Sequence, residues 1–348
     1  MTGISPGSDS RIPFTGRRAL LRGAAGLLPV LVPAAPALAA PALVTKREKI
    51  TFVWFQAALC LVAIGVAQRE GLFERNGLEV EFLQAGGDIA PILEALAMGK
   101  ADATSHFLLR FMKPLEAGFD ARLTAGLHAG CFFLVASREA GIGTLQDLRG
   151  KRIGMADLGS PMKMLFEIHL QRNGVPLDSI TWRQFPSDVF AIAAEKGEID
   201  AFADVDPNAY YAVRRSRGKL FVLAANGSGE LANHACCGLL LSGRLIRERR
   251  PVAAALTRAL TEAALLVGRD NPAAVASAQQ FSPKQAKPEE LGEMIAGYPH
   301  TEQLAVTGAA LRRHVLYHAQ GLKETGVLKP GTDPARFTER VTVDVLAG

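Results

Sequence analysis

Cysteine and aromatic residues are scarce in this sequence. Four of its 348 residues are cysteine, and aromatic residues make up 7% of the chain. Four cysteines are too few for the disulfide framework on which small secreted scaffolds depend. A composition of 49% hydrophobic and 21% charged residues is instead typical of a globular protein, and this length suffices for about two domains.

An excess of charge of one sign is also missing from most of the chain. Outside the first 39 residues, the sequence holds 35 basic and 33 acidic residues. No concentrated basic face follows from this balance, so we expect no nucleic-acid partner. Beyond the N-terminal region, no segment reaches the ~18 consecutive apolar residues that a membrane-spanning helix needs. We therefore expect a soluble mature protein.

Residues 1–39 have the pattern of an export signal. Residues 17–22 are Arg-Arg-Ala-Leu-Leu-Arg, an apolar stretch follows, and residues 37–39 are Ala-Leu-Ala. A charged segment, an apolar segment and an A-x-A end are typical of a signal peptide. The paired arginines resemble a twin-arginine signal, a type that exports folded proteins, and an ordinary Sec signal is the alternative. We expect the signal to be removed and the mature protein to be periplasmic.

Two stretches of the chain repeat one pattern. Residues 95–103 and 193–201 both have a helical segment, a glycine, two residues, Asp-Ala and the start of a strand. Their separation of about 100 residues is too long for a solenoid repeat and suits two similar lobes. Alternating strand and helix patterns predict a mostly parallel sheet covered by helices. The expected strands are 49–55, 79–85, 101–104, 121–126, 131–137, 180–185, 220–224 and 235–241, with shorter ones near 153 and 200.

The order of these segments resembles that of the periplasmic solute-binding proteins of ABC importers. The resemblance is carried by 67–80, the Gly86-Gly87 turn, 98–103, 145–154, 197–203 and 326–334. It is strongest to the nitrate, sulfonate and taurine group, which includes the NMT1/THI5-like binders of thiamine-pyrimidine precursors. The resemblance implies a two-lobed α/β, type II periplasmic-binding-protein fold with two crossovers. Lobe 1 is then 45–130 with 238–348, and lobe 2 is 131–237.

Ligand contacts are expected where the carboxyl ends of strands meet helix N-termini. The candidates are Gln56, Gly87, Asp88, Ser105, Gly159, Ser160 and Asp204. Backbone amides at the helix starts after Gly87 and at Ser160 favour an anionic group, although each of these residues also suits a loop or cap. Asp206 precedes a proline and suits a helix cap, whereas Asp204 ends a strand. Its carboxylate repels nitrate or sulfate across a dry cleft, so we expect a solute with N–H donors or positive charge, unless an arginine pairs with Asp204.

Histidine and cysteine recur at both expected crossovers. Residues 128–131 are His-Ala-Gly-Cys, and residues 234–237 are His-Ala-Cys-Cys. On a strand Cys236 and Cys237 point to opposite faces, so only one of them is expected to face Cys131. Three interpretations stay open, with free thiols and no metal as the first. The second is a disulfide from Cys131 to Cys236 or Cys237, and the third is a metal site of His128, Cys131, His234 and Cys236, a ligand set that suits zinc or copper.

These patterns together predict a binding protein and no enzyme. It captures a small organic solute, either a sulfonate or a nitrogen-containing compound such as a pyrimidine, and delivers it to an ABC permease. We expect a monomer without a cofactor. One alternative is an enzyme similar to the pyrimidine-precursor synthases, whose compact cysteine cluster is split here between 128–131 and 234–237. Another alternative is a periplasmic protein that binds metal through cysteine and histidine.

Overall fold

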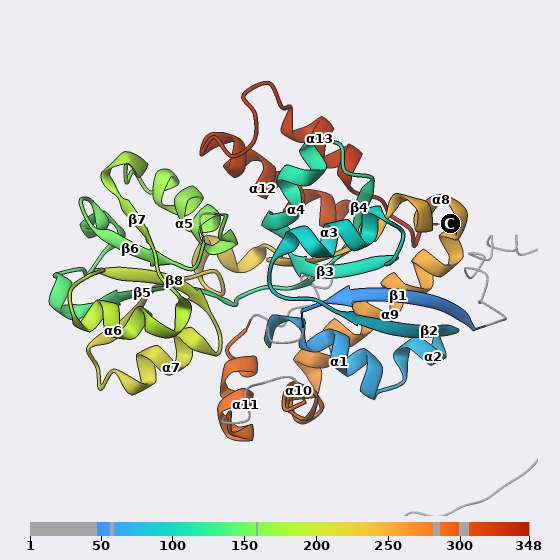
Figure 1. The fold of residues 1–348 in the computed structure, drawn as a ribbon, viewed down its shortest axis with the longest axis horizontal. Helices are drawn as coiled ribbons and strands as arrows, with labels where there is room; N and C mark the ends of the chain where they lie inside the picture. Colours follow the sequence, from blue (N-terminus) through green and yellow to red (C-terminus); the bar gives the residue numbers. More distant parts are fainter. Residues whose placement is uncertain (1–46, 56–58, 158, 281–285, 299–305, 348) are drawn as a thin grey trace, which may run out of the picture. The chain divides into compact units, whose positions relative to one another are not determined.

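The computed structural model describes residues 47–55, 59–157, 159–280, 286–298 and 306–347 (Figure 1). The predicted signal at 1–39 lies outside the described residues, and residues 40–348 form one compact unit. This unit contains two five-stranded sheets, each covered by helices. The predicted α/β fold with two crossovers is therefore confirmed.

The first sheet has the strand order β2-β1-β3-β10-β4. Its central strands β3 and β10 are buried along their whole length, as expected for strands covered on both faces. β1 pairs in parallel with β2 and β3, and β10 runs antiparallel to both β3 and β4. The strands are β1 (Glu48–Trp54), β2 (Leu78–Gln84), β3 (Ala103–Phe107), β4 (Ala121–His128) and β10 (Cys237–Ser242).

The second sheet repeats this arrangement with the order β7-β6-β8-β5-β9. β6 pairs in parallel with β7 and β8, whereas β5 runs antiparallel to β8 and β9. In each sheet the antiparallel strand is the first strand after a crossover, so the two lobes share one topology. The strands are β5 (Phe132–Ser137), β6 (Arg152–Met155), β7 (Thr181–Gln184), β8 (Ala201–Val205) and β9 (Leu220–Ala225).

Alternation of side chains along the strands builds a core on both faces of each sheet. Val53 packs with α3, whereas Phe52 and Trp54 belong to the main core with α1 and with α9 (Arg250–Arg269). Val135 and Phe202 likewise pack with α6 and α7, on the face opposite α5 (Figure 1). The helices of the first lobe before the crossover are η1 (Leu59–Leu61), α1 (Val62–Arg69), α2 (Leu72–Arg75), α3 (Ile89–Ala97) and α4 (Leu108–Glu116). Those of the second lobe are η2 (Arg138–Ala140), η3 (Leu145–Leu148), α5 (Pro161–Arg172), η4 (Leu177–Ser179), η5 (Ser187–Val189), α6 (Phe190–Glu195), α7 (Asn208–Arg215) and η6 (Gly229–Asn233).

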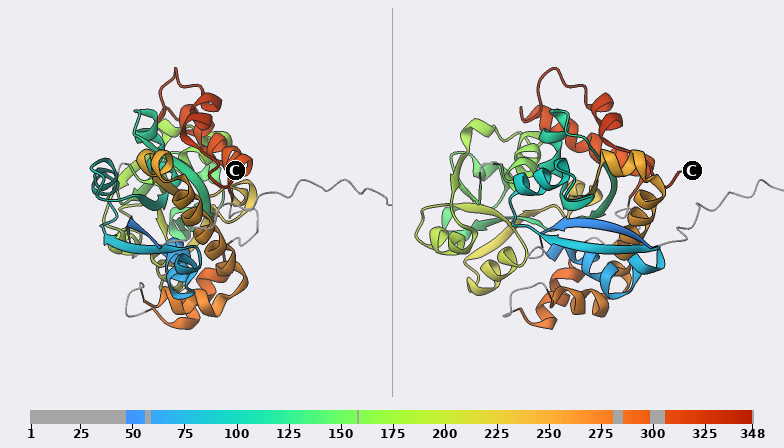
Figure 2. Two further views of the ribbon diagram at one scale, coloured as in Figure 1. Left: turned by 90° about the vertical axis from the view of Figure 1, so that its right-hand side faces the viewer. Right: turned by 45° about the vertical axis from the view of Figure 1, so that its right-hand side comes forward.

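The C-terminal part of the chain is helical, as predicted. It comprises α8 (Gly243–Glu248), α9 (Arg250–Arg269), α10 (Asn271–Ala278), α11 (Pro288–Ala296), α12 (Gly308–Glu324) and α13 (Pro334–Val341). α12 and α13 pack together beside β4 (Figure 2). Among the described residues, α9 alone has the length and composition of a membrane span, with a mean hydropathy of 1.3. Its buried side chains pack against α1 and β4, as those of a core helix do.

The repeated pattern seen in the sequence forms the same structure in both lobes. Gly99 and Gly197 follow α3 and α6 with φ angles of 70° and 66°, a left-handed conformation that glycine adopts without a steric penalty. Two residues later an amide donates back to the last helical turn in each lobe, from Ala101 to Ala95 and from Ile199 to Ala193. The equivalence of the two lobes thus extends to individual hydrogen bonds.

An aspartate directly precedes β3 in the first lobe and β8 in the second, and it fastens each strand to its parallel neighbour, β1 or β6. Asp102 accepts a hydrogen bond from the Thr51 amide at Oδ2, over 3.1 Å. Asp200 accepts one from the Arg152 amide at Oδ2, over 2.8 Å, and also pairs with the guanidinium of Arg152. Since each of these carboxylates bonds a backbone amide of the neighbouring strand, the Asp-Ala step of the repeat sets the strand register.

The two crossovers lie side by side, as predicted. The Cys236 amide donates to the His128 carbonyl over 2.8 Å, which joins the returning chain to the end of β4. The Phe132 amide donates to the Asn226 side-chain oxygen over 2.7 Å, and the Asn226 amide donates back to the Phe132 carbonyl over 3.0 Å. These bonds place the end of β4, the start of β5 and the start of β10 at one point in the fold.

Candidate functional site

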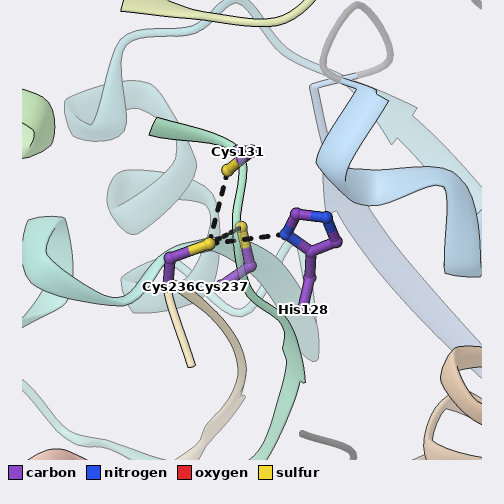
Figure 3. A group of neighbouring side chains, drawn as sticks. All are labelled: His128, Cys131, Cys236 and Cys237. Carbon is purple, nitrogen blue, oxygen red and sulfur yellow. Dashed lines mark hydrogen bonds between the residues drawn. The ribbon is translucent and has the colours of Figure 1, made fainter. Parts of the chain in front are cut away.

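A buried group of histidine and cysteine side chains lies where the crossovers meet. His128, Cys131, Cys236 and Cys237 direct one ligand atom each toward a common centre, and these atoms all lie within 4.8 Å of one another (Figure 3). The sulfurs of Cys131 and Cys236 are 3.3 Å apart, and those of Cys236 and Cys237 are 3.8 Å apart. Nδ1 of His128 lies 3.4 Å from the Cys236 sulfur. These four residues are named the crossover cluster below.

The backbone at the start of β10 explains why both adjacent cysteines enter the crossover cluster. The expectation that only one of Cys236 and Cys237 faces Cys131 is wrong. Cys236 lies in a bend, and the strand begins at Cys237, so strand alternation does not apply to this pair. The pairing of β10 with β4 also shifts register directly after Cys237. Both sulfurs therefore lie near Cys131.

Cys60 extends the crossover cluster to all four cysteines of the chain. It is buried in η1, in the segment that follows the end of β1. Its thiol adjoins the Cys131 and Cys237 thiols, which act on its pKa. The sequence contains a usable signal for this placement, because Cys60 follows a predicted strand at the carboxyl edge where ligand residues are expected. Cysteines from three distant segments thus meet in one place.

Burial and mutual hydrogen bonds determine the protonation of these thiols. Hydrogen bonds from Cys131 and Cys237 hold the pKa of Cys60 well below its ordinary value. Burial opposes ionisation of Cys236, but hydrogen bonds from the same two thiols hold its pKa well below the ordinary value too. Burial raises the pKa of Cys131 and Cys237. Burial also acts to lower the pKa of His128, but the adjacent Cys236 thiolate outweighs it and raises that pKa.

All four cysteines are free thiols in the structure. The predicted disulfide from Cys131 to Cys236 or Cys237 is not formed there, and the closest pair of sulfurs is at hydrogen-bond distance. Pairing by oxidation stays a prediction. The free thiolate is the form of cysteine that binds metal ions and reacts as a nucleophile. The crossover cluster therefore has the chemistry of a metal-ligand set in a fully buried setting.

His234 lies outside the crossover cluster, contrary to its assignment in the predicted metal site. Its ring stacks on the Tyr317 ring with centroids 3.5 Å apart and an angle of 9° between the planes. It also contacts the rings of His314 and His318 on α12. Because His234 precedes the bend at Cys236, its side chain faces α12, and Cys237 takes its place among the four converging residues.

Two histidines of α12 hold the backbone beside Cys236. Nε2 of His318 donates to the Ala235 carbonyl over 2.8 Å, and the Ala235 amide donates to Nδ1 of His314 over 3.0 Å. The carbonyl partner requires His318 to carry its proton on Nε2. Burial lowers the pKa of His318 to about 4, which keeps the ring neutral near pH 7. Ala235 is thereby fixed on both sides, and this positions Cys236.

Two buried carboxyl groups lie at the carboxyl end of β8. Asp206 accepts a hydrogen bond from the Tyr298 hydroxyl over 2.9 Å and one from the Tyr210 amide over 3.2 Å. Asp204 accepts from the Val205 amide over 2.8 Å. Burial raises the pKa of each carboxyl to about 6. Within the described part of the chain no arginine pairs with Asp204. An arginine partner would have neutralised the carboxylate and removed the reason to expect a solute with N–H donors.

Tyr298 connects this acidic pair to the crossover cluster. Its ring meets the His128 ring edge to face, with centroids 4.7 Å apart, while its hydroxyl bonds Asp206. A second contact between the lobes is made by Phe107 at the end of β3 and Phe132 at the start of β5, whose ring centroids are 5.1 Å apart. The strand ends of both sheets therefore share one buried region with the crossover cluster.

The end of β3 contributes buried polar groups to this region. Ser105 is fully buried, and its hydroxyl has no hydrogen-bond partner among the described residues. The neighbouring Thr104 hydroxyl is in the same situation. Burial and the charge of Arg110 lower the pKa of His106 to about 3, so this ring is neutral at physiological pH. Buried hydroxyls without partners are uncommon in folded proteins and mark places where a ligand can bond.

The remaining predicted ligand residues lie in different settings. Gln56 is outside the described residues. Gly87 is exposed, and Asp88 is an exposed cap of α3 that accepts from the Ala90 amide over 3.1 Å. Ser160 is fully buried before α5, and the neighbouring loop, which contains Gly159, is tied to the first lobe by an Arg110–Asp157 ion pair of 2.8 Å. Ser105, Ser160 and Asp204 are thus buried, whereas Gly87 and Asp88 are not.

Two hollows differ in how they relate to this region. A narrow space that leaves no room for a water molecule is lined by Phe55, Cys60, Leu61, His106 and Phe107. An open hollow of about 480 Å³ lies instead between α6 and α7, with Asp188, Glu195 and Tyr211 in its wall. Among the predicted ligand residues, Asp204 is the one closest along the chain to the open hollow, because Pro207 and Asn208 line that hollow.

Comparison with protein families identifies related sequences. The NMT1/THI5 like family model matches residues 61–273, which is more than half of the chain. A "putative thiamine biosynthesis protein" of Haemophilus influenzae is 28% identical over 130 residues. That match spans 36% of this chain and 41% of the relative, so it covers less than half of either protein.

Solved structures with a similar fold cover most of the chain. The alkanesulfonate-binding protein SsuA of Xanthomonas axonopodis pv. citri, bound to MOPS, has a TM-score of 0.66 at 19% identity over 85% of this chain and 98% of its own. The aliphatic sulphonate-binding SsuA of Escherichia coli has a TM-score of 0.68 at 17% identity, covering 86% and 93%. The nitrate-binding NrtA of Synechocystis PCC 6803 has a TM-score of 0.67 at 13% identity, covering 86% and 87%. The chain therefore has the two-lobed fold of periplasmic binding proteins.

Proposed function

Because the chain belongs to the NMT1/THI5-like family, we propose that it is an exported solute-binding protein that captures a small nitrogen-containing organic solute between its lobes. The solute is then delivered to an ABC permease, and the predicted signal at 1–39 sends the protein to the periplasm. Sulfonate- and nitrate-binding proteins with the same fold support this role.

The observation that carries the proposal is the buried carboxyl group of Asp204. It is the penultimate residue of β8, the strand that corresponds to β3 in the other lobe, and its exposed fraction is 2%. A second buried carboxyl, Asp206, lies two residues away. Carboxylates in a dry site repel bare anions such as nitrate and attract N–H donors or positive charge. The site therefore favours a solute with amino or ring N–H groups.

The end of β3 in the first lobe offers the proposed site neutral hydrogen-bonding groups. Ser105 offers a hydroxyl without a partner among the described residues, and His106 beside it is neutral. A pyrimidine or an aminoalkyl sulfonate presents both donors and acceptors to such groups. The solute enters when the lobes separate and is enclosed when they close, in the manner of hinge closure around a ligand.

A thermal-shift screen of the full chain tests this proposal. The compounds are pyrimidines, aminoalkyl sulfonates, simple amines, alkyl sulfonates and inorganic anions. A solute that binds the folded state raises the melting temperature by mass action, and we expect pyrimidines or amino compounds to do so. A response to inorganic anions alone, or to no compound, would contradict the proposal.

Recovery of the solute distinguishes binding from catalysis. After incubation with a compound that raises the melting temperature, the protein is denatured and the released compound is identified by mass spectrometry. We expect the compound to be unchanged. A changed mass would favour the alternative of an enzyme related to pyrimidine-precursor synthesis.

A further inference from the structure

We propose that the crossover cluster is a mononuclear zinc site, in which His128, Cys131, Cys236 and Cys237 hold one Zn²⁺ ion that ties the two crossovers together. This site is separate from the proposed solute contacts. The sequence alone favours free thiols as the first interpretation, and its alternative metal site contains His234. The proposed zinc site differs from both, because it binds metal and has Cys237 as the ligand in place of His234.

The distances within the crossover cluster match a tetrahedral zinc site. With Zn–S bonds of about 2.3 Å and Zn–N bonds of about 2.0–2.1 Å, the ligand atoms of a tetrahedron stand roughly 3.5–3.8 Å apart. The Cys131–Cys236 and Cys236–Cys237 sulfurs are 3.3 Å and 3.8 Å apart, and His128 Nδ1 is 3.4 Å from the Cys236 sulfur. Small side-chain movements are enough to admit one ion at the centre.

The kinds of ligand restrict the ion that fits. Three thiols and one imidazole form the Cys₃His set that is common in structural zinc sites, and hard cations such as Mg²⁺ and Ca²⁺ require oxygen ligands. All four residues are buried, with exposed fractions of 6% or less. A site closed to solvent suits a structural ion. The spread of 4.8 Å or less between ligand atoms also favours one ion over an iron–sulfur cluster, whose bridging sulfides separate its thiolates.

Neighbouring residues that would not touch the ion hold the four ligands in position, as residues around the ligands do in other metal sites. His314 and His318 fix both backbone groups of Ala235, and this sets the position of Cys236. Cys60 adjoins the Cys131 and Cys237 thiols and lies outside the set of four. Groups of this kind orient metal ligands and stabilise the thiolate form that binds the ion.

The position of the crossover cluster gives the ion a mechanical role. His128 and Cys131 belong to the first crossover, and Cys236 and Cys237 belong to the second. An ion bound by all four restrains the point about which the lobes move. The predicted twin-arginine signal fits this assignment, because it exports folded protein and so allows the ion to bind in the cytoplasm, where thiols stay reduced.

Metal analysis of the full chain tests the proposal. The protein is purified without chelator, under nitrogen and with reductant, and its zinc content is measured by mass spectrometry of the elements. We expect about one zinc per chain. Cobalt exchanged for zinc should give the thiolate-to-metal charge-transfer absorption of a tetrahedral thiolate site.

Matched variants distinguish the four ligands from their neighbours. Cys131→Ser and Cys237→Ser should lower zinc affinity by more than the roughly 10–100-fold typical of a change in one of these neighbours, and abolish the cobalt band. Cys60→Ser should retain stoichiometric zinc. His128→Ala should lose zinc, whereas His234→Ala should keep it. Circular dichroism confirms that each variant is folded, and cobalt titration of the folded wild type gives a result that does not depend on the variants.

Several outcomes would overturn the proposal. They are a folded, reduced wild type that takes up neither zinc nor cobalt, stoichiometric copper in place of zinc, and equal zinc loss in Cys60→Ser and Cys131→Ser. A disulfide from Cys131 that forms in the exported protein and persists in the presence of zinc would also overturn it.

Discussion

The hydroxyl of Tyr298 donates a hydrogen bond to Oδ2 of Asp206 over 2.9 Å, and both residues are buried. Asp206 follows β8 in the second lobe, whereas Tyr298 follows α11 in the C-terminal part of the chain. The same tyrosine ring packs against His128 of the crossover cluster. One side chain therefore couples the acidic strand end to the proposed zinc site.

Tyr298→Phe should destabilise the protein by about 1–3 kcal/mol at pH 7, because it leaves a buried carboxylate without its phenol donor. The hydrogen bond from Tyr298 acts to lower the pKa of Asp206, so the variant should raise that pKa further above about 6. The loss should shrink at pH 4–5, where the carboxyl is neutral. Urea denaturation at both pH values measures it.

Tyr211→Phe is the matched control for this substitution. Its hydroxyl donates to Glu290 over 2.9 Å, but Glu290 is only half-buried, whereas Asp206 is buried. Hydrogen bonds that solvent can reach contribute less to stability, so we expect a loss below about 1 kcal/mol. Equal losses in the two variants would show that burial of Asp206 does not matter.

Asp204→Asn should change how stability depends on pH. The folded-state pKa of about 6 lies above the ordinary value of 3.8, so the folded wild type holds a proton that the unfolded chain has released. The Asp204 carboxyl therefore contributes to the free energy of unfolding of the wild type below about pH 4, and this contribution is lost as the pH rises through about 6. Relative to wild type, the variant should gain up to about 2–3 kcal/mol between pH 4 and pH 6.

Urea denaturation across pH 4–7 measures this difference, with Asp188→Asn as the control because Asp188 is exposed. The buried histidines act in the opposite direction, since burial lowers the pKa of His106 to about 3 and that of His318 to about 4. Their contribution is present in both proteins and cancels in the comparison. A stability difference that stays constant from pH 4 to pH 6 would contradict the assigned environment of Asp204.

Asp102→Asn and Asp200→Asn should each destabilise the fold by about 1–3 kcal/mol. Each carboxylate bonds a backbone amide of the neighbouring strand, and bonds to charged groups are worth roughly this amount. Chemical denaturation of both variants measures the loss, and exposed Asp178→Asn serves as the reference. If Asp102→Asn or Asp200→Asn lowers the free energy of unfolding no more than Asp178→Asn does, the two aspartates of the repeat do not contribute equally to stability.

His318→Gln should weaken zinc binding by roughly 10–100-fold without removing a ligand, because it disturbs the bond that fixes Ala235. Competition with a coloured zinc chelator measures the affinity. The comparison is His234→Gln, whose ring stacks on Tyr317 and lies outside the crossover cluster. Unchanged zinc affinity in His318→Gln would remove the positioning role from this histidine.

The sequence predicts the lobes well because their signals are local. The helix, glycine and Asp-Ala pattern at 95–103 and 193–201 determines a turn and a strand start within nine residues, and both are present. The two crossovers were predicted from the places of strands 131–137 and 235–241 in the order of segments that the chain shares with the family. Such features depend on neighbours along the chain, so one sequence is sufficient.

The crossover cluster was only partly predictable because it depends on contacts between distant segments. His128, Cys131 and Cys236 are found together as the crossovers imply. Cys237 joins them because Cys236 lies in a bend, so the side chains of Cys236 and Cys237 do not point to opposite faces of a strand. No residue near position 236 predicts that bend. The placement of His234 against Tyr317 depends on how α12 packs, and the sequence pattern does not contain that information.

Isothermal titration of a responding pyrimidine or amino compound into wild type, Asp204→Asn and Asp188→Asn distinguishes an interlobe solute site from binding in the open hollow. Asp188 lines the open hollow between α6 and α7, and Asp204 lies at the strand end. We expect saturable one-to-one binding that Asp204→Asn weakens at least about tenfold, a cost of about 1.4 kcal/mol, and that Asp188→Asn leaves unchanged. Weakening by Asp188→Asn with full affinity in Asp204→Asn would place the solute in the hollow and contradict the account.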